Sequence, residues 1–221
     1  MAKSISLVLE PFQLLLSVAT TLARIWAGWP GRAAARMPEQ TLILYEFEGC
    51  PFCRIARESI TSLRLPVEIR PCPKRGERFR PRVLEMGGKA QFPYLVDPNT
   101  EIQMYESADI VRYLYRTYGG RRAPVSLFFG PLNVQLSMLS LALRRWNGIR
   151  CRHRAIEIER PLEMSGAEAD PMARLLREIL CELELPYVLT PRMVISLRDP
   201  NTKRTLDSSF SARRYLLAQY G

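Results

Sequence analysis

Two cysteines three positions apart are the residues of this sequence whose spacing most clearly indicates chemistry. Cys50 and Cys53 enclose Pro51 and Phe52, directly after a run of strand-forming residues. Cysteines at this spacing at a helix start can form a reversible disulfide. The first of them lies where free backbone N–H groups and the helix dipole stabilise a thiolate. The pattern therefore predicts redox or thiol chemistry at Cys50 and Cys53.

One further observation supports this prediction for the cysteine pair, and two alternatives compete with it. Arg54 and Arg57 fall within the next two turns, where their charge would help to stabilise a thiolate. A metal site is an alternative, but it needs two more ligands, and the chain has no second Cys-x-x-Cys and one histidine, His153. A purely structural pair is a second alternative. No metal is expected.

The composition limits the compartment and the partners. The chain has 221 residues, a formal net charge of +10 and five cysteines, without the even spacing of a secreted disulfide framework. A reducing, cytoplasmic location is therefore expected. The charge favours anionic partners. The basic stretches 74–82 and 144–154 are not interleaved with aromatics in a nucleic-acid-binding pattern, so no nucleic acid is expected. The roles of Cys72, Cys151 and Cys181 stay unassigned.

The elements around the cysteine pair follow from periodicity and turn residues. The order strand, helix, strand, helix, strand, strand, helix is expected between residues 41 and 119. Ser107 is expected to cap the last helix. The ranges are strands at 41–47, 65–70, 92–96 and 102–105, and helices at 51–63, 80–85 and 108–118.

This order, with Cys-Pro-Phe-Cys at the first strand-to-helix turn, resembles the thioredoxin-like module of glutaredoxins and of the glutathione S-transferase N-terminal domain. Two further segments carry the resemblance. Residues 88–95, Gly-Lys-Ala-Gln-Phe-Pro-Tyr-Leu, look like the family's Gly-Lys-Val-Pro-x-Leu segment. Glu106-Ser107, followed by Ile110 and Tyr113-Leu114, looks like its Glu-Ser-x-x-Ile-x-x-Tyr-Leu segment.

The resemblance implies a glutathione site. Pro93 would be a cis-proline facing the dithiol, and the backbone of Phe92 would pair with the cysteinyl part of glutathione. Glu106 and Ser107 would hold the γ-glutamyl end, and Lys89 the glycine carboxylate. Pro51 and Phe52 complete the expected binding residues. The simpler alternatives are a trans proline at a strand edge, a plain helix cap at Ser107 and a solvated Lys89. An iron–sulfur cluster held by two chains and two glutathiones is a further alternative.

The chain also matches itself. From residue 6 to residue 70 an offset of 120 needs no gap, and the offset later becomes 102, so the second copy is 18 residues shorter. Cys50, Cys53, Pro93 and Glu106 meet Asp170, Ala173, Ile195 and Ser208, so the second copy has lost its site. The expected fold is α/β, with two tandem thioredoxin-like repeats. The whole chain resembles a bacterial and plastid family of tandem glutathione-transferase N-terminal domains.

Each copy is expected to begin with an amphipathic helix, at 11–26 and 131–146. The predicted organisation is a helix and linker (1–40), the dithiol domain (41–119), a helix and basic linker (120–160) and a degenerate domain (161–221). Leu15, Val18, Leu22 and Trp26 share one helix face. That first helix is expected to pack internally or to attach reversibly to an anionic membrane surface.

These inferences lead to one main hypothesis and two alternatives. The chain is expected to be a glutathione-linked thiol–disulfide oxidoreductase of glutaredoxin type, with glutathione as co-substrate and glutathionylated or disulfide substrates. A non-catalytic glutathione-binding or scaffold module is the first alternative. An activity like that of glutathione transferases is the second, although a second repeat follows here where transferases continue into an all-helical domain.

Overall fold

The computed structural model describes residues 14–15, 17–18, 28–124, 135, 147–152 and 157–221. The two expected opening helices therefore lie almost wholly outside the described residues. Residues 14–15 and 17–18 are helical, with Leu15 67% and Val18 37% exposed. Ser17 is buried, and its hydroxyl donates to the carbonyl of Pro171 at 3.0 Å. Internal packing and membrane attachment of the first helix both stay predictions.

Residues 42–119 have the expected order of elements, which is that of a thioredoxin-like domain. The strands are β1 (Leu42–Glu46), β2 (Val67–Pro71), β3 (Tyr94–Asp97) and β4 (Ile102–Met104). The helices are α2 (Pro51–Leu63), α3 (Arg80–Gly87) and α4 (Ser107–Leu114), and α4 continues as one π-helical segment, η1 (Tyr115–Gly119).

One local prediction in this part was wrong. Ser107 is the first residue of α4 rather than its cap, and the cap position is Glu106, with φ at 66°. Neither side chain caps the helix, because the Glu106 side chain makes no capping hydrogen bond and Ser107 already lies within the helix.

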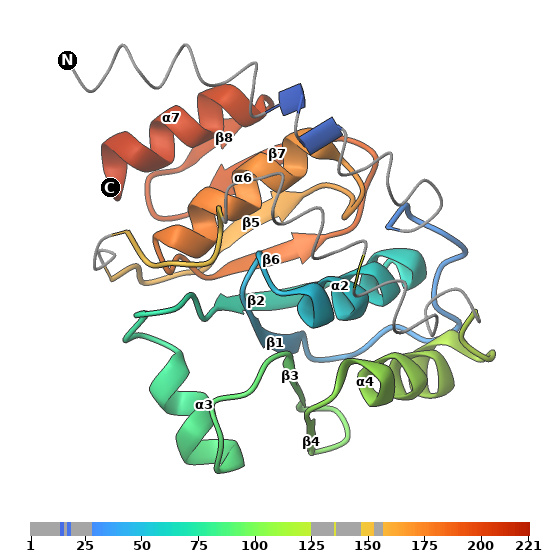
Figure 1. Ribbon diagram of the computed structural model, residues 1–221. Helices are drawn as coiled ribbons and strands as arrows, with labels where there is room; N and C mark the ends of the chain where they lie inside the picture. The colour runs from blue at the N-terminus through green and yellow to red at the C-terminus, as the bar shows by residue number, and fades with distance from the viewer. Residues whose placement is uncertain (1–13, 16, 19–27, 125–134, 136–146, 153–156) are drawn as a thin grey trace.

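The later part of the chain has a second set of elements (Figure 1). These are β5 (Leu162–Ser165), α6 (Pro171–Glu182), β6 (Tyr187–Thr190), β7 (Ser196–Asp199), β8 (Arg204–Leu206) and α7 (Ser209–Gln219). β5 pairs parallel with β6 and antiparallel with β7, and β7 pairs with β8. The strands of the first part pair in the same order. No helix separates β6 from β7, where the first part has α3 between β2 and β3.

All eight strands form one sheet, in the order β4-β3-β1-β2-β6-β5-β7-β8. The two parts meet at its centre, where β2 and β6 pair antiparallel with Glu68 opposite Val188. We call residues 28–124 the first half and residues 147–221 the second half. The central pairing makes the sheet continuous from one half to the other.

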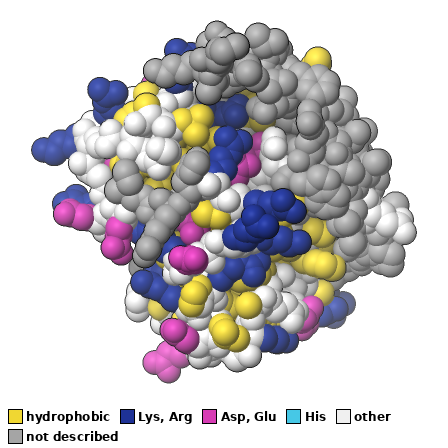
Figure 2. Space-filling view, turned by 60° about the vertical axis from the view of Figure 1, so that its left-hand side comes forward, with side chains coloured by type: hydrophobic (Ala, Val, Ile, Leu, Met, Phe, Trp, Pro, Cys, Tyr) yellow, Lys and Arg dark blue, Asp and Glu magenta, His cyan; other side chains and the backbone are white. Residues whose placement is uncertain are grey.

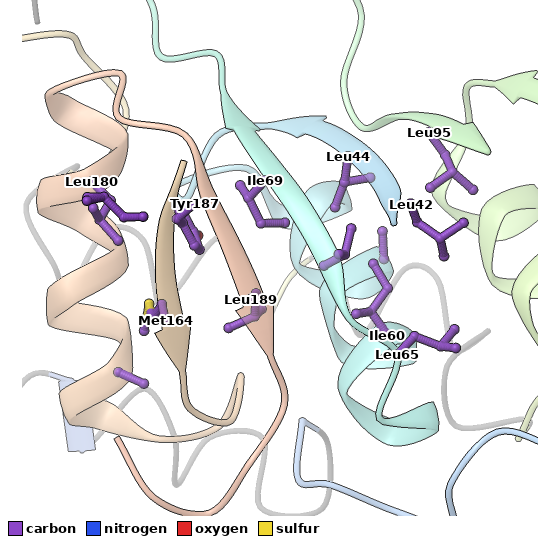
Figure 3. Packing of buried hydrophobic residues seen from close by; sticks show 14 of the residues in the cluster. Leu42, Leu44, Ile60, Leu65, Ile69, Leu95, Met164, Leu180, Tyr187 and Leu189 are labelled. Atoms are coloured by element: carbon purple, nitrogen blue, oxygen red, sulfur yellow. The ribbon is translucent and has the colours of Figure 1, made fainter. Parts of the chain in front are cut away.

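One hydrophobic core runs across that seam. Leu44, Ile60 and Ile69 of the first half and Leu180 and Tyr187 of the second belong to the same cluster of buried side chains (Figure 3). Helix α2 lies against α4, and α6 lies against α7 (Figure 1). Each helix pair covers the sheet of its own half, and the shared core joins the two. No helix in the described part of the chain has the length and apolar character needed to cross a membrane.

Candidate functional site

The structure places Cys50 at the N-cap of α2, at the end of the short loop that follows β1. Its backbone is extended, with φ −88° and ψ 122°, and Pro51 opens the helix. The backbone N–H of Cys53 donates to the Cys50 sulfur at 3.3 Å. Both thiols are free, and they are 4% and 0% exposed respectively. The predicted dithiol turn is therefore present, with its first sulfur at the positive end of the helix.

The two thiols have opposite tendencies to ionise. Burial raises the pKa of Cys50, but hydrogen bonds from the Cys53 thiol and from the N–H groups of Cys53 and Phe52 outweigh it and lower the pKa overall. Burial raises the pKa of Cys53 well above its ordinary value, and donation to Cys50 adds to the rise. Because the thiolate is the nucleophile, these opposite pKa shifts favour Cys50 over Cys53 as the thiol that ionises first.

The loop before β3 faces this turn. The Phe92–Pro93 peptide bond is cis, as the resemblance implied. The Cys50 sulfur lies 4.0 Å from the carbonyl oxygen of Phe92. The Phe92 ring meets that of Phe47 edge to face, and the Arg80 guanidinium lies 4.8 Å from its centre. This contact of Arg80 could not be predicted from the sequence, because it depends on where the start of α3 lies relative to the loop before β3.

Two of the other predicted glutathione residues, Glu106 and Lys89, contact residues of the neighbouring loops. Glu106 accepts a hydrogen bond from the Gln91 amide, which adjoins Phe92. The Lys89 ammonium lies 4.6 Å above the ring of Tyr105, whose hydroxyl donates to the Lys89 carbonyl at 2.7 Å. Sequence reasoning had not assigned roles to Gln91 and Tyr105.

The remaining predicted binding residues differ in their exposure. Phe52 is 47% exposed at the first turn of α2, whereas Ser107 is buried. The backbone of Glu106 has a positive φ, which residues other than glycine seldom adopt and which recurs at ligand sites. The described contacts thus link Cys50 to Phe92 and Gln91 to Glu106, while Lys89 sits beside Tyr105.

Arg54 and Arg57 do not serve the thiolate, contrary to expectation. Arg57 is fully buried and pairs with Glu46, Glu48 and Glu168. Arg54 pairs with Glu58 at 3.2 Å. These arginines neutralise carboxylates behind the dithiol, because a buried charge is stable only beside an opposite one.

Arg177 of α6 completes this set of buried charges. It pairs with Glu48 at 3.1 Å and with Glu168 at 3.0 Å. Burial raises the pKa of Glu46 to about 7, against the attraction of Arg57. Arg177 and Arg57 outweigh burial at Glu168 and hold its pKa far below the usual range. We call the residues Glu46, Glu48, Arg54, Arg57, Glu58, Glu168 and Arg177 the buried ion cluster.

The other cysteines are poorly placed for thiol chemistry. Burial raises the pKa values of Cys72 and Cys181 well above their ordinary range. The Cys151 thiol is half-buried and lies 3.7 Å from a carboxylate oxygen of Glu184. Within the described ranges no three histidine, cysteine or acidic residues gather as a metal site would require, and His153 falls outside them.

The two basic stretches of the sequence meet in space. The N–H of Lys74 donates to the carbonyl of Ile149 at 2.6 Å, and that of Cys151 donates to the carbonyl of Lys74 at 3.0 Å. On the face of the molecule that Figure 2 draws, Lys and Arg side chains gather near the centre, beside exposed hydrophobic groups. Arg80, which stacks on Phe92, belongs to the first stretch. Positive charge therefore extends to the rim of the dithiol site.

The turn of the second half that corresponds to the dithiol has no thiol. Asp170 is the N-cap of α6, and its carboxylate accepts from the N–H groups of Met172 and Ala173 at 2.8 and 3.3 Å. The prediction that Asp170 acts as a helix cap is confirmed.

Comparison with known proteins agrees with this geometry. Residues 44–122 match the family model for the glutathione S-transferase N-terminal domain. In this segment the chain is similar to a glutathione S-transferase N-terminal domain. A glutathione transferase of Bombyx mori is 28% identical over 39% of this chain and 39% of its own length, with a TM-score of 0.35. The chain thus spans well under half of that enzyme. No curated protein matches the chain.

Proposed function

We propose that the protein is a glutathione-linked thiol–disulfide oxidoreductase of glutaredoxin type, with Cys50 as nucleophile and Cys53 as resolving thiol. The observation that carries the proposal is the asymmetry of the two sulfurs. Cys50 caps α2, accepts the Cys53 N–H and has a lowered pKa, whereas the pKa of Cys53 is raised. A pair of this kind supplies one thiolate for attack and one protonated thiol in reserve.

The reaction follows from thiol–disulfide exchange. The Cys50 thiolate attacks the glutathione sulfur of a mixed disulfide, so a Cys50–glutathione disulfide forms and the substrate leaves as a thiolate that takes up a proton. Cys53 loses its proton and attacks the Cys50 sulfur, which releases reduced glutathione and leaves a Cys50–Cys53 disulfide. Two molecules of glutathione then reduce that disulfide and become one molecule of oxidised glutathione.

Glutathione would lie along the rim between the dithiol and α4. The Phe92 backbone would pair with its cysteinyl part beside Cys50, from which the Phe92 carbonyl is 4.0 Å away. The γ-glutamyl group would bind Glu106 and the start of α4 at Ser107, where free helical N–H groups favour a carboxylate. Lys89 would pair with the glycine carboxylate, and the adjacent basic face favours anionic substrates. Pro51 and Phe52 would contact the ligand from α2.

The proposal extends to the organisation of the chain. Residues 161–221 would be a degenerate thioredoxin-like repeat of residues 41–119, with 1–40 and 120–160 as the helices and linkers that precede them. The matching strand order and the matching helix caps at Cys50 and Asp170 support this. We propose a cytoplasmic location. We also propose that residues 11–26 make peripheral contact with an anionic membrane, which co-sedimentation with vesicles tests.

The direct test is turnover of a glutathionylated peptide with glutathione as reductant. The wild-type protein should catalyse it, Cys50→Ser should not, and Cys53→Ser should retain deglutathionylation because glutathione itself can attack the Cys50 adduct. Equal rates for wild type and Cys50→Ser, or no turnover by either, would falsify the proposal.

A non-catalytic glutathione-binding or scaffold module is the second candidate, and the burial of both sulfurs favours it. Cys50 is 4% exposed, so a substrate disulfide must displace covering groups to reach it. Glutathione binding without turnover, measured by calorimetry, would select this candidate. Conjugation of glutathione to an aromatic electrophile in the same preparation would instead indicate transferase activity.

A further inference from the structure

The loop that delivers Cys50 is held by the second half of the chain. Residues 47–49 connect β1 to Cys50, and the two residues before the cysteine each contact the second half. The N–H of Gly49 donates to the carbonyl of Gly148 at 3.1 Å. The N–H of Glu48 donates to the sulfur of Cys181 at 3.4 Å. The backbone immediately before the nucleophile is therefore anchored by α6 and by the segment 147–152.

The side chain of Glu48 is anchored from the same side. Arg177 donates to its carboxylate through Nε at 3.1 Å and through Nη2 at 3.3 Å. The guanidinium is fully buried, and Glu48 is 7% exposed. A paired arginine fork fixes direction as well as distance, because both its donors and the carboxylate are planar.

An indirect contact completes the hold. The carbonyl of Glu48 accepts from Arg57 Nη2 at 3.3 Å, and Arg57 Nε donates to Glu168 of the second half at 2.9 Å. Glu168 thereby fixes Arg57, the α2 side chain that donates to the carbonyl of Glu48. The N–H groups of Glu48 and Gly49 thus have buried partners, and so do the carbonyl and the carboxylate of Glu48.

We propose that Gly148, Arg177, Cys181 and Glu168 are positioning residues for Cys50, so that the half of the chain without a dithiol sets the reactive geometry of the half that has one. The inference rests on the proposed role of Cys50 as nucleophile. Cys50 owes its reactivity to donors at the start of α2, and these act at short range. A loop that shifts by a fraction of an ångström moves the sulfur away from them.

Two glycines offer a matched test. A Cβ on Gly148, whose φ is +71°, would lie 2.9 Å from the Cβ of Glu48 and 3.2 Å from its Cγ. A Cβ on Gly120, whose φ is +57°, would lie 3.0 Å from the Cβ of Ala35. Gly148→Ala and Gly120→Ala thus introduce the same methyl, a positive-φ backbone strain and an overlap with a side-chain Cβ. The first pushes on the Cys50 loop and the second on Ala35, in the segment before β1.

The experiment measures alkylation of Cys50 by iodoacetamide as a function of pH, with the Cys50 peptide followed by mass spectrometry. Gly148→Ala should slow alkylation at neutral pH about three- to tenfold, because the pKa of Cys50 rises as its donors move away. Gly120→Ala should change the rate less than about twofold. The readout needs no glutathione, so it stays informative even if the protein turns over no substrate.

Milder variants decide the matter if Gly148→Ala does not fold. Cys181→Ala removes the acceptor of the Glu48 N–H, whereas Cys181→Ser keeps a donor and an acceptor at that position. Arg177→Lys keeps the positive charge but loses the two-pronged hydrogen bonding to the Glu48 carboxylate. Cys181→Ala and Arg177→Lys should slow alkylation about two- to threefold, and Cys181→Ser should restore the wild-type profile. The proposal is overturned if folded Gly148→Ala matches wild type or matches Gly120→Ala, or if the milder variants leave the profile unchanged.

Discussion

The turn at Cys50 and the turn at Asp170 have the same framework and different chemistry. Each begins a helix with a proline in its first turn, and the cap side chain of each accepts N–H groups of that turn. Each is followed by a buried arginine seven positions later, Arg57 in one case and Arg177 in the other. The thiol is present in only one. The comparison indicates that helix capping and ion pairing suffice to keep such a turn, whether or not it carries a nucleophile.

A second pair of sites supports that lesson. In each half the buried aspartate that ends the third strand accepts hydrogen bonds from two tyrosine hydroxyls that lie in or directly after the last helices of that half. The two sets are Asp97 with Tyr113 and Tyr118, and Asp199 with Tyr215 and Tyr220. Both lie at the ends of hairpins away from the dithiol. Structural contacts of this kind recur in both halves, whereas the groups that would do chemistry occur once.

The largest difference between the two turns should appear in activity. Cys50→Ser should lower turnover of a glutathionylated peptide at least about a hundredfold, because the nucleophile is lost. Asp170→Ser, the matched change, should leave turnover within about twofold, because serine is also a good helix cap. Initial rates at saturating glutathione test both. A loss in Asp170→Ser as large as that in Cys50→Ser would mean that the second turn takes part in the reaction.

The buried ion cluster should dominate stability. Arg57→Met should lower the free energy of unfolding by about 3–5 kcal/mol, because Glu46, Glu48 and Glu168 would lose a buried partner. Arg198→Met is the control, since the pair of Arg198 with Glu163 is exposed and should contribute less than about 1 kcal/mol. Denaturant unfolding measures both. Equal losses would show that the cluster contributes no more than a surface pair.

The two aspartates should give matched acid sensitivity. Burial raises the pKa values of Asp97 and Asp199, but the hydrogen bonds from the tyrosine hydroxyls outweigh it and lower both pKa values below the ordinary range of aspartate. Their ionised forms therefore stabilise the fold above about pH 4, and this stability is lost as the pH falls through their lowered values.

Asp97→Asn and Asp199→Asn should each lower the free energy of unfolding at pH 7 by about 1–3 kcal/mol. Each should also flatten the decline at low pH. Denaturant midpoints between pH 3 and pH 7 measure both effects. If one variant flattens the decline and the other does not, the two tyrosine sites are not equivalent.

The smallest effect concerns the carboxylate behind the dithiol. Burial raises the pKa of Glu46 to about 7, and its negative charge raises the pKa of Cys50. As the pH rises through 7, Glu46 ionises and its negative charge disfavours the Cys50 thiolate. The rate of Cys50 alkylation should therefore increase about two- to threefold less over this range than the rate of a single isolated thiol. Glu46→Gln should give a single titration step in Cys50 alkylation. A single step already present in the wild type would rule out this coupling.

The sequence predicted much of the first half because its signals are local. Pro51 after a strand fixes the start of α2, and Gly87 and Gly88 stand at the end of α3. The cis bond before Pro93 came from the family resemblance alone. The cap of α4 was assigned one residue late, because serine is the better cap by type and nothing in the sequence signals the positive φ of Glu106.

The buried ion cluster could not be predicted from helix periodicity. Spacing places Arg54 and Arg57 on α2, but it does not tell what lies across from them. The decisive partner, Glu168, is 111 positions away from Arg57. One signal was available: Glu48 and Arg57 recur as Glu168 and Arg177 at the offset of the repeat. Opposite charges that recur at the offset of the proposed repeat indicate a contact between the two halves once β2 and β6 are known to pair.

The pairing of β2 with β6 also determines how the molecule presents its sheet to other proteins. The strands left at the two ends of the sheet are β4 and β8, with three residues each. An edge this short offers a neighbouring chain few hydrogen bonds, and Arg204 adds an exposed charge to one of them. The longer strands that would otherwise invite edge-to-edge association are paired with each other. Among the described residues, the sheet thus leaves little backbone for a neighbouring chain to pair with, and we expect a partner to recognise side chains or loops instead.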